Sequence, residues 1–188
     1  MQKVKSPMTA DVIENLRAGD QVLISGIIYV ARDAAHKRIV EALDRGDKPP
    51  FDLQGQTLYY MGPSPTKPGK IIGSAGPTTS GRMDAYTPRL LSAGLKAMIG
   101  KGLRSAAVKE AIREQRAVYL AAVGGAAALI ARTIVNSEIV AYEELGAEAI
   151  LRLEVEDFPA IVINDCHGGD LYQEGKARYK ISAEVTKQ

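Results

Sequence analysis

The spacing of hydrophobic residues along this chain alternates between the pattern of strands and the pattern of helices. Residues 21–30 are rich in β-branched side chains and predict a strand. Residues 33–44 place their apolar side chains on one side and predict a helix that ends near Gly46. Residues 105–116 repeat this amphipathic pattern, with charged residues on the opposite face. The chain therefore reads as strands connected by helices.

Shorter elements complete the pattern. Strands are predicted at 57–61, 117–123, 139–142, 150–155 and 160–164, and short helices after Thr9 and across 126–133. We therefore expect an α/β fold with a mixed sheet and glycine-ended strand-to-helix junctions, in a single domain of residues 1–188. The polar, mildly basic residues 176–188 are expected to form a tail that frays.

A charged pair occupies the junction between the predicted strand 21–30 and the helix that follows it. Asp33 stands where a helix N-cap would be, and an N-cap side chain accepts a backbone N–H. Arg32 lies between the two elements, where open α/β folds tend to place ligand-binding groups. A surface arginine without such a role is the alternative that these residues leave open.

Residues 73–88 contain three glycines, two adjacent threonines and an arginine. The glycines allow tight turns and a close approach of a ligand to the backbone. Thr78 and Thr79 offer hydroxyl groups, and Arg82 offers a planar fork of donors that matches a carboxylate or a phosphate. The segment predicts a site for a small anion. An ordinary strand-to-helix turn is the alternative, because no generic phosphate-loop pattern is matched.

Lys101 stands between two glycines further along the chain. This context predicts an exposed corner of backbone that holds the ammonium group toward a ligand. A solvated loop lysine is the alternative reading of the same residues.

Composition restricts the partners and the chemistry. The formal net charge of +2 is too small to indicate binding to nucleic acid or to an anionic membrane. No apolar run approaches the roughly 20 residues that span a bilayer, and the first residues lack the apolar stretch of a signal peptide, so a cytoplasmic location is expected. Two histidines and one cysteine are too few for the usual zinc sites or for an iron–sulfur cluster. Adjacent Cys166 and His167 would point to opposite sides of an extended backbone, which argues against a nucleophilic dyad.

Several sequence motifs of this chain are those of a known enzyme family. They are Ala31-Arg-Asp-Ala-Ala-His-Lys-Arg38, Gly76-Pro-Thr-Thr-Ser-Gly-Arg-Met-Asp84, Lys101-Gly-Leu-Arg104, Tyr142-Glu-Glu-Leu-Gly-Ala-Glu-Ala-Ile150 and Val155-Glu-Asp-Phe-Pro-Ala160. In these motifs the chain closely resembles the β subunit of class I, iron–sulfur-dependent fumarate hydratase and of its sister family, L-tartrate dehydratase. In single-chain class I fumarases the same sequence forms the C-terminal domain. The resemblance implies a swivelling β/β/α domain.

The resemblance also implies roles for five residues. Arg32, Arg82 and Lys101 would bind the carboxylates of the substrate, with Thr78 and Thr79 beside them in the active site. Thr78, Thr79, Arg82 and Lys101 would contribute to catalysis. Thr78 is the family's proposed proton-transfer group, and orienting the substrate by hydrogen bonds is the alternative, because an unassisted hydroxyl group has too high a pKa for a base.

The function implied is the reversible hydration of fumarate to L-malate, a reaction of the tricarboxylic acid cycle. The cations would hold these dianions, while loss of the hydroxyl group needs a Lewis acid. This chain has no residues to hold one, so the resemblance implies a [4Fe–4S] cluster on a partner α subunit. The two chains would form an α2β2 hetero-oligomer, and this chain would be inactive without its partner. An L-tartrate dehydratase β subunit and a non-catalytic dicarboxylate-binding module remain alternatives.

Overall fold

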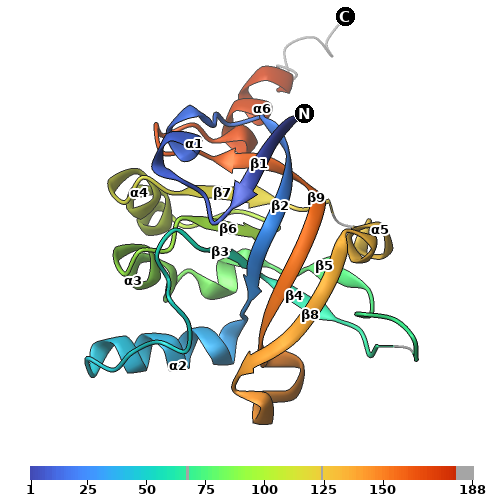
Figure 1. The fold of residues 1–188 in the computed structure, drawn as a ribbon. Helices are drawn as coiled ribbons and strands as arrows, with labels where there is room; N and C mark the ends of the chain where they lie inside the picture. The colour runs from blue at the N-terminus through green and yellow to red at the C-terminus, as the bar shows by residue number, and fades with distance from the viewer. Residues whose placement is uncertain (67, 124, 181–188) are drawn as a thin grey trace, which may run out of the picture.

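A seven-stranded mixed sheet forms the centre of the molecule (Figure 1). The computed structural model describes residues 1–66, 68–123 and 125–180. The strands of the sheet are β1 (Gln2–Ser6), β2 (Gln21–Val30), β3 (Thr57–Tyr59), β6 (Ala97–Gly100), β7 (Val118–Ala121), β8 (Ile134–Ala141) and β9 (Ile150–Asn164). The first five run parallel, whereas β9 runs antiparallel to β2, β7 and β8. This arrangement confirms the predicted α/β class with a mixed sheet.

The sheet closes on itself through its longest strand, β9. This strand pairs with β2 along most of its length and with β7 through its last residues, so that β2, β3, β6, β7 and β9 form a ring. Successive side chains of the ring strands face opposite sides: Tyr59 and Ile99 pack in one hydrophobic cluster, Leu58 and Met98 in the other. Because β2, β3, β6 and β7 run parallel, their carboxyl ends lie at one edge of the ring.

Helices and an extended arm surround the ring. The helices are α1 (Ala10–Asn15), α2 (Asp33–Asp44), α3 (Thr87–Ser92), α4 (Ala106–Glu114), α5 (Ala127–Arg132) and α6 (Leu171–Tyr179), with 3-10 helices η1 (Ser80–Met83) and η2 (Glu143–Glu148). We call strands β4 (Met61–Pro63) and β5 (Ala75–Pro77), with the described residues between them, the arm. Figure 1 shows α2, α3 and α4 on one side of the sheet, and α5 and the arm on the other. None of the helices in the described ranges combines the length and the hydrophobicity of a membrane span.

Strand β9 is longer than the sequence predicts. It joins the predicted strands 150–155 and 160–164 through Phe158 and Pro159. Proline lacks an N–H and therefore suits only positions where a strand edge has no neighbour. β8 pairs with β9 only as far as Val155 and β7 only from Ile161, so Pro159 lies in a gap between these two neighbours.

The ends of other elements also differ from the predictions. β8 begins at Ile134, whereas a strand is predicted only from residue 139, because polar residues interrupt its first half. Residues 176–179 of the predicted tail continue α6. Residues 181–188 of that tail lie outside the described residues.

Candidate active site

Three of the five predicted site residues follow strand ends. Arg32 lies two residues after β2, Thr78 directly after β5 and Lys101 directly after β6. Because β2 and β6 are parallel strands of one ring, their carboxyl ends lie at the same edge. The N–H of Thr78 donates to the carbonyl oxygen of Tyr60 at 2.8 Å, and the N–H of Tyr60 donates to that of Ile99 at 2.8 Å. The end of β5 therefore joins the same edge.

Backbone hydrogen bonds hold the two threonines beside Lys101. Thr79 and Lys101 form a parallel β-bridge. The N–H of Ser80 donates to the carbonyl oxygen of Lys101 at 2.9 Å, and the N–H of Lys101 donates to that of Thr78 at 3.3 Å. Gly100 permits this contact, because a Cβ at that position would collide with the side chain of Ser80. The loop that carries the threonines and the loop that carries the lysine are thus held together.

Arg82 reaches the junction between β2 and α2 through an ion pair. Its Nε lies 2.8 Å from Oδ1 of Asp33, which follows Arg32 in the chain. The prediction that Asp33 caps α2 is wrong, because Arg32 occupies the N-cap position and Asp33 is the first residue of the helix. The carboxylate of Asp33 instead binds Arg82. The structure therefore brings all five predicted site residues to one edge of the ring.

Sequence reasoning missed Glu148, the last residue of η2. One of its carboxylate oxygens accepts the N–H of Ala34 at 2.8 Å, and the other lies 3.7 Å from Nη2 of Arg32. Glu148 thus takes the capping role at the N-terminus of α2, where an anion is favoured by the helix dipole. Glu148 lies 114 residues from Ala34, and no local pattern in the sequence signals this contact.

The site has unused capacity for hydrogen bonds and is open to solvent. Nε of Arg32 and Oδ2 of Asp33 are buried without a hydrogen-bond partner among the described residues. A buried polar atom without a partner costs about 1–3 kcal/mol, so such atoms commonly mark a place for a ligand. Thr79 and Lys101 are exposed, and the side chain of Arg82 is 52% exposed. Arg82 and Lys101 therefore line an open surface that a second body has room to cover, whereas the side chain of Arg32 is only 18% exposed.

Buried Arg104 lies beneath this surface and holds the segments that form it. Its fully buried side chain places Nε 2.7 Å from Oδ1 of Asp84 and donates from Nη2 to Oγ1 of Thr87 at 2.7 Å. The other carboxylate oxygen of Asp84 accepts the N–H of Ser105 at 2.6 Å. Since Asp84 directly follows η1, these bonds tie the segment of Arg82 to the segment that follows Lys101.

A second link joins the same two loops through Tyr119. Its hydroxyl group donates to the carbonyl oxygen of Gly102 at 2.9 Å and lies 2.9 Å from Oγ of Ser80. Burial raises the pKa of Tyr119, so its hydroxyl group stays protonated and remains a donor. Tyr119 thus fixes the loop after Thr79 relative to the loop after Lys101.

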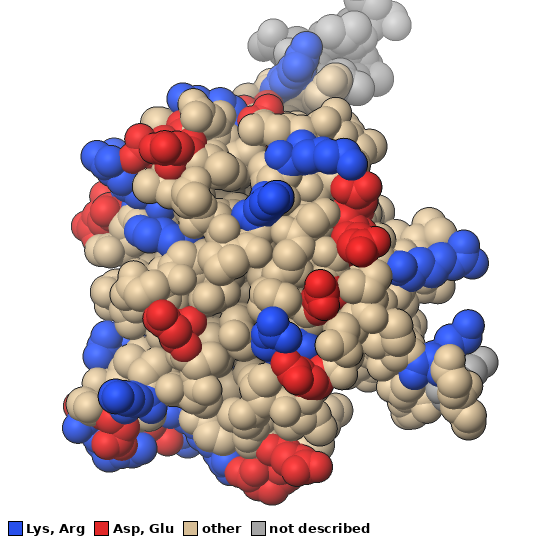
Figure 2. Space-filling model, in the orientation of Figure 1, with Lys and Arg blue, Asp and Glu red and all other residues tan. Residues whose placement is uncertain are grey.

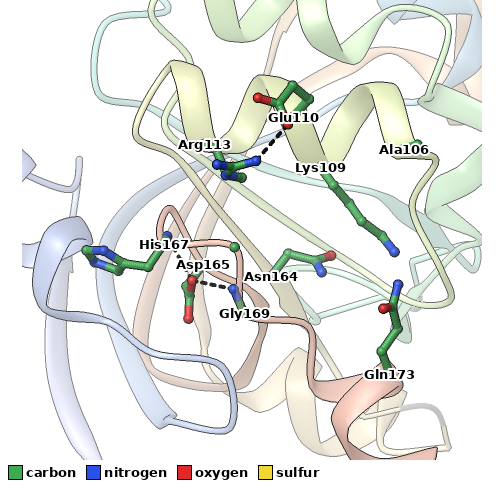
Figure 3. Close-up of a pocket in the computed structure, with 10 residues that line it drawn as sticks. Ala106, Lys109, Glu110, Arg113, Asn164, Asp165, His167, Gly169 and Gln173 are labelled. Carbon is green, nitrogen blue, oxygen red and sulfur yellow. Dashed lines mark hydrogen bonds and ion pairs between the residues drawn. The ribbon is translucent and has the colours of Figure 1, made fainter.

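A separate cleft lies away from this site. Figure 3 shows a cleft of about 490 Å³ between α4 and the loop after β9, with Lys109 directed toward Asn164 and Gln173. None of the five predicted site residues lines it. Cys166 belongs to this loop but does not line the cleft, and its sulfur lies 3.8 Å from the carbonyl oxygen of Ile13, at the edge where β2 begins. Burial raises the pKa of the Cys166 thiol, which favours the unreactive protonated form.

The arrangement suits a small molecule with two negative groups. The same edge of the ring carries two guanidinium groups, one ammonium group and two threonine hydroxyl groups, and all of these groups can donate to carboxylate oxygens. The described residues contain no group of three or more His, Cys, Asp or Glu side chains that could hold a metal ion. The lone cysteine lies at the opposite edge of the ring, so this site has no thiolate for an iron–sulfur cluster.

Comparison with known proteins shows the family of this chain. Residues 2–175 match the family model described as "Fumarase C-terminus", and the chain belongs to that family. It is 44% identical over 153 residues to the aerobic class I fumarate hydratase of Salmonella typhimurium and 42% identical over 153 residues to that of Escherichia coli. It is 37% identical over 180 residues to a Methanocaldococcus jannaschii protein assigned as L(+)-tartrate dehydratase subunit beta.

These relatives differ in how much of their length the chain spans. The matched segment covers 80% of this chain but only 26% and 28% of the two bacterial fumarate hydratases. The segment of 180 residues that matches the Methanocaldococcus protein covers 93% of this chain and 92% of that protein. The chain therefore spans about a quarter of the fumarate hydratases and nearly all of the relative whose name contains a subunit designation.

Proposed function

We propose that this chain is the β subunit of an iron–sulfur hydro-lyase that interconverts fumarate and L-malate. It supplies the carboxylate-binding half of an active site that it shares with a cluster-bearing α subunit. The observation that supports the proposal is that Arg32, Arg82, Lys101, Thr78 and Thr79 lie at one edge of the ring, in a member of the fumarase C-terminus family.

The cations divide the work of holding the substrate. Arg82 binds the carboxylate next to the carbon that loses its proton, because negative charge accumulates there and a preorganised arginine stabilises it most. Arg32 and Lys101 hold the second carboxylate, with Arg32 kept in place by Glu148. Ion pairing with Asp33 keeps Arg82 at the edge of the ring before the substrate arrives.

The threonines complete the contacts to the substrate. Thr79 is exposed beside Lys101 and donates a hydrogen bond to a carboxylate oxygen. Thr78 either moves the proton or orients the reacting carbon, and its high intrinsic pKa favours the orienting role unless a neighbour assists. A [4Fe–4S] cluster held by the α subunit would supply the Lewis acid for loss of the hydroxyl group.

Tartrate is the second candidate substrate. The relative that this chain nearly covers end to end carries the tartrate dehydratase name, which favours this alternative. The fumarate hydratases share the higher identity, and for this reason we place fumarate and malate first. Tartrate differs from malate by one hydroxyl group, and contacts to that group from the α subunit would decide between them.

The test is a kinetic comparison of two arginine variants in the pair of chains reconstituted without oxygen. Arg82 and Arg89 are matched, since each places Nε within 2.9 Å of an aspartate oxygen on α2. We expect Arg82→Ala to lower kcat/KM for malate by about 1,000-fold and Arg89→Ala to leave it within a factor of two. Equal activities in the two variants would remove Arg82 from the mechanism. Turnover of tartrate alone would transfer the proposal to the second substrate, and tight malate binding without turnover would favour the non-catalytic module.

A further inference from the structure

An apolar surface lies on the side of the molecule that the arm and α5 share. Of the large hydrophobic side chains exposed in the described residues, most lie on this side, and Met1, Leu103 and Tyr179 are the others. We call the following set the apolar face: Ile71 of the arm, Val123, Leu129 of α5, and Val135, Ile139 and Val140 of β8. A concentration of exposed hydrophobic residues of this kind is typical of an interface between proteins.

A groove adjoins the apolar face, and Ile71 belongs to both. It has a volume of about 710 Å³ and lies between the arm, which contributes Ile71 and Ile72, and α5, which contributes Ala128 and Ala131. Figure 2 shows the two walls as lobes that stand out from the body on the right, with a hollow between them. The charged residues among its described lining are Lys70 and Arg132, and both are basic.

Strand β8 forms the other part of the apolar face. It is the last strand of the sheet order and pairs only with β9, so its second edge has no partner strand among the described residues. Residues 138–140 of the strand are exposed, and Ile139 is 52% exposed. An uncovered strand edge that carries apolar side chains is a ready site for another chain.

The arm connects this face to the candidate active site. Gly62 of β4 lies against Arg32, since a Cβ there would be 3.4 Å from Nη1 of the arginine. At its other end, β5 leads directly into Thr78. A body that covers the exposed cations therefore lies next to the base of the arm, and the apolar face continues from that point.

We propose that the apolar face is the docking surface for the cluster-bearing α chain, an inference that rests on the proposed function. The relatives suggest the occupant: only 26% and 28% of the two fumarate hydratases match this chain, so each of these enzymes carries a further, larger part beside an equivalent domain. The α chain would present apolar side chains to Leu129 and Ile139, with carboxylates that meet Lys70 and Arg132.

The test measures binding of the α chain, purified with its cluster under anaerobic conditions, by titration calorimetry. The variants are Leu129→Asp and Ile139→Asp, which place a carboxylate at exposed positions and therefore preserve the fold. We expect each to raise Kd by about 100-fold, the loss typical of a central apolar contact. Tyr179→Asp on α6 is the matched control, since Tyr179 is exposed but lies outside the apolar face, and it should bind like the wild type.

The outcomes separate this proposal from the proposed function. Wild-type affinity in both variants, together with an active reconstituted pair, would overturn the docking surface alone. The isolated chain could instead form a dimer that Leu129→Asp dissociates, while binding of the α chain is unchanged. In that case the apolar face would be an interface between two copies of this chain, which would also overturn the proposal. Failure of the wild-type chain to bind the α chain would overturn both. Circular dichroism and urea unfolding check that each variant is folded.

Discussion

Acid should destabilise this protein through His36, the buried histidine of α2. Its side chain is completely buried, and Nδ1 lies 2.8 Å from the carbonyl oxygen of Arg32. A carbonyl oxygen only accepts, so Nδ1 carries the proton of the neutral ring. Nε2 is buried without a partner among the described residues, and a second proton there would have no acceptor. Burial lowers the pKa of His36 from 6.5 to about 4, although the hydrogen bond to Arg32 acts in the opposite direction.

The sign and size of the effect follow from this pKa. Between pH 6.5 and about 4 the unfolded chain binds a proton that the folded chain excludes, so the free energy of unfolding falls as the pH falls. At about 1.4 kcal/mol per pKa unit, the contribution is about 3 kcal/mol in total. It is fully present above pH 6.5, and about 2 kcal/mol of it is lost between about pH 7.5 and about pH 5.

Urea unfolding at these two pH values measures the effect. The wild type should lose about 2 kcal/mol more than His36→Asn, which has no imidazole to protonate. His167→Asn, at the exposed histidine of the loop after β9, controls for the loss of an imidazole. The same loss of stability in the wild type and in His36→Asn would exclude His36 as the cause, because the acid effect would then come from other groups.

Substitutions of three further residues, Arg104, Glu148 and Thr78, test the site and its support. Arg104→Met should lower the free energy of unfolding by about 3–5 kcal/mol, because it leaves the partly buried carboxylate of Asp84 without its partner. Arg113→Met is the control: it breaks the exposed ion pair with Glu110 and should lower the free energy of unfolding by less than about 1 kcal/mol in the same urea titration. Glu148→Ala should lower the free energy of unfolding by about 1 kcal/mol, because the cap of α2 is lost, and it should raise KM for malate in the reconstituted pair. Glu148→Gln should recover the stability. An unchanged KM in both variants would exclude a role of Glu148 in positioning Arg32. Thr78→Ser should keep most of the turnover and Thr78→Val should lose it, and equal rates in the two would exclude the Thr78 hydroxyl group from the reaction.

Local sequence patterns predicted the elements that bury one face and failed where tertiary pairing decides. α4 carries a clear amphipathic stripe and the cap Ser105, and it appears within two residues of its predicted bounds. β1 was missed, because its sequence is short and polar and it is a strand only through its pairing with β2. β9 was divided at Pro159, because the local rule against proline in strands cannot show that one edge of β9 has no neighbour there.

The residues of the candidate site also fall into two groups, those that the sequence predicts and those that it does not. Motifs and residue types identified Arg32, Arg82 and Lys101 as candidates, since strand ends and glycine-flanked positions are visible in the sequence. The residues that hold them could not be predicted from the sequence. Glu148 contacts α2 across 114 residues of chain, from a 3-10 helix, η2, that bends at Gly146, where φ is 56°. The roles of the five predicted residues in binding and catalysis stay predictions that the variants above address.

The most direct test of the central claim is an anaerobic activity titration. A fixed amount of the cluster-bearing α chain is mixed with increasing amounts of this chain, and the formation of fumarate from L-malate is followed. We expect no turnover from either chain alone, and a rate that rises with the amount of this chain and saturates at equimolar amounts. Full activity of the α chain alone, or no activity at saturation with malate or tartrate, would contradict the claim that this chain supplies half of the active site.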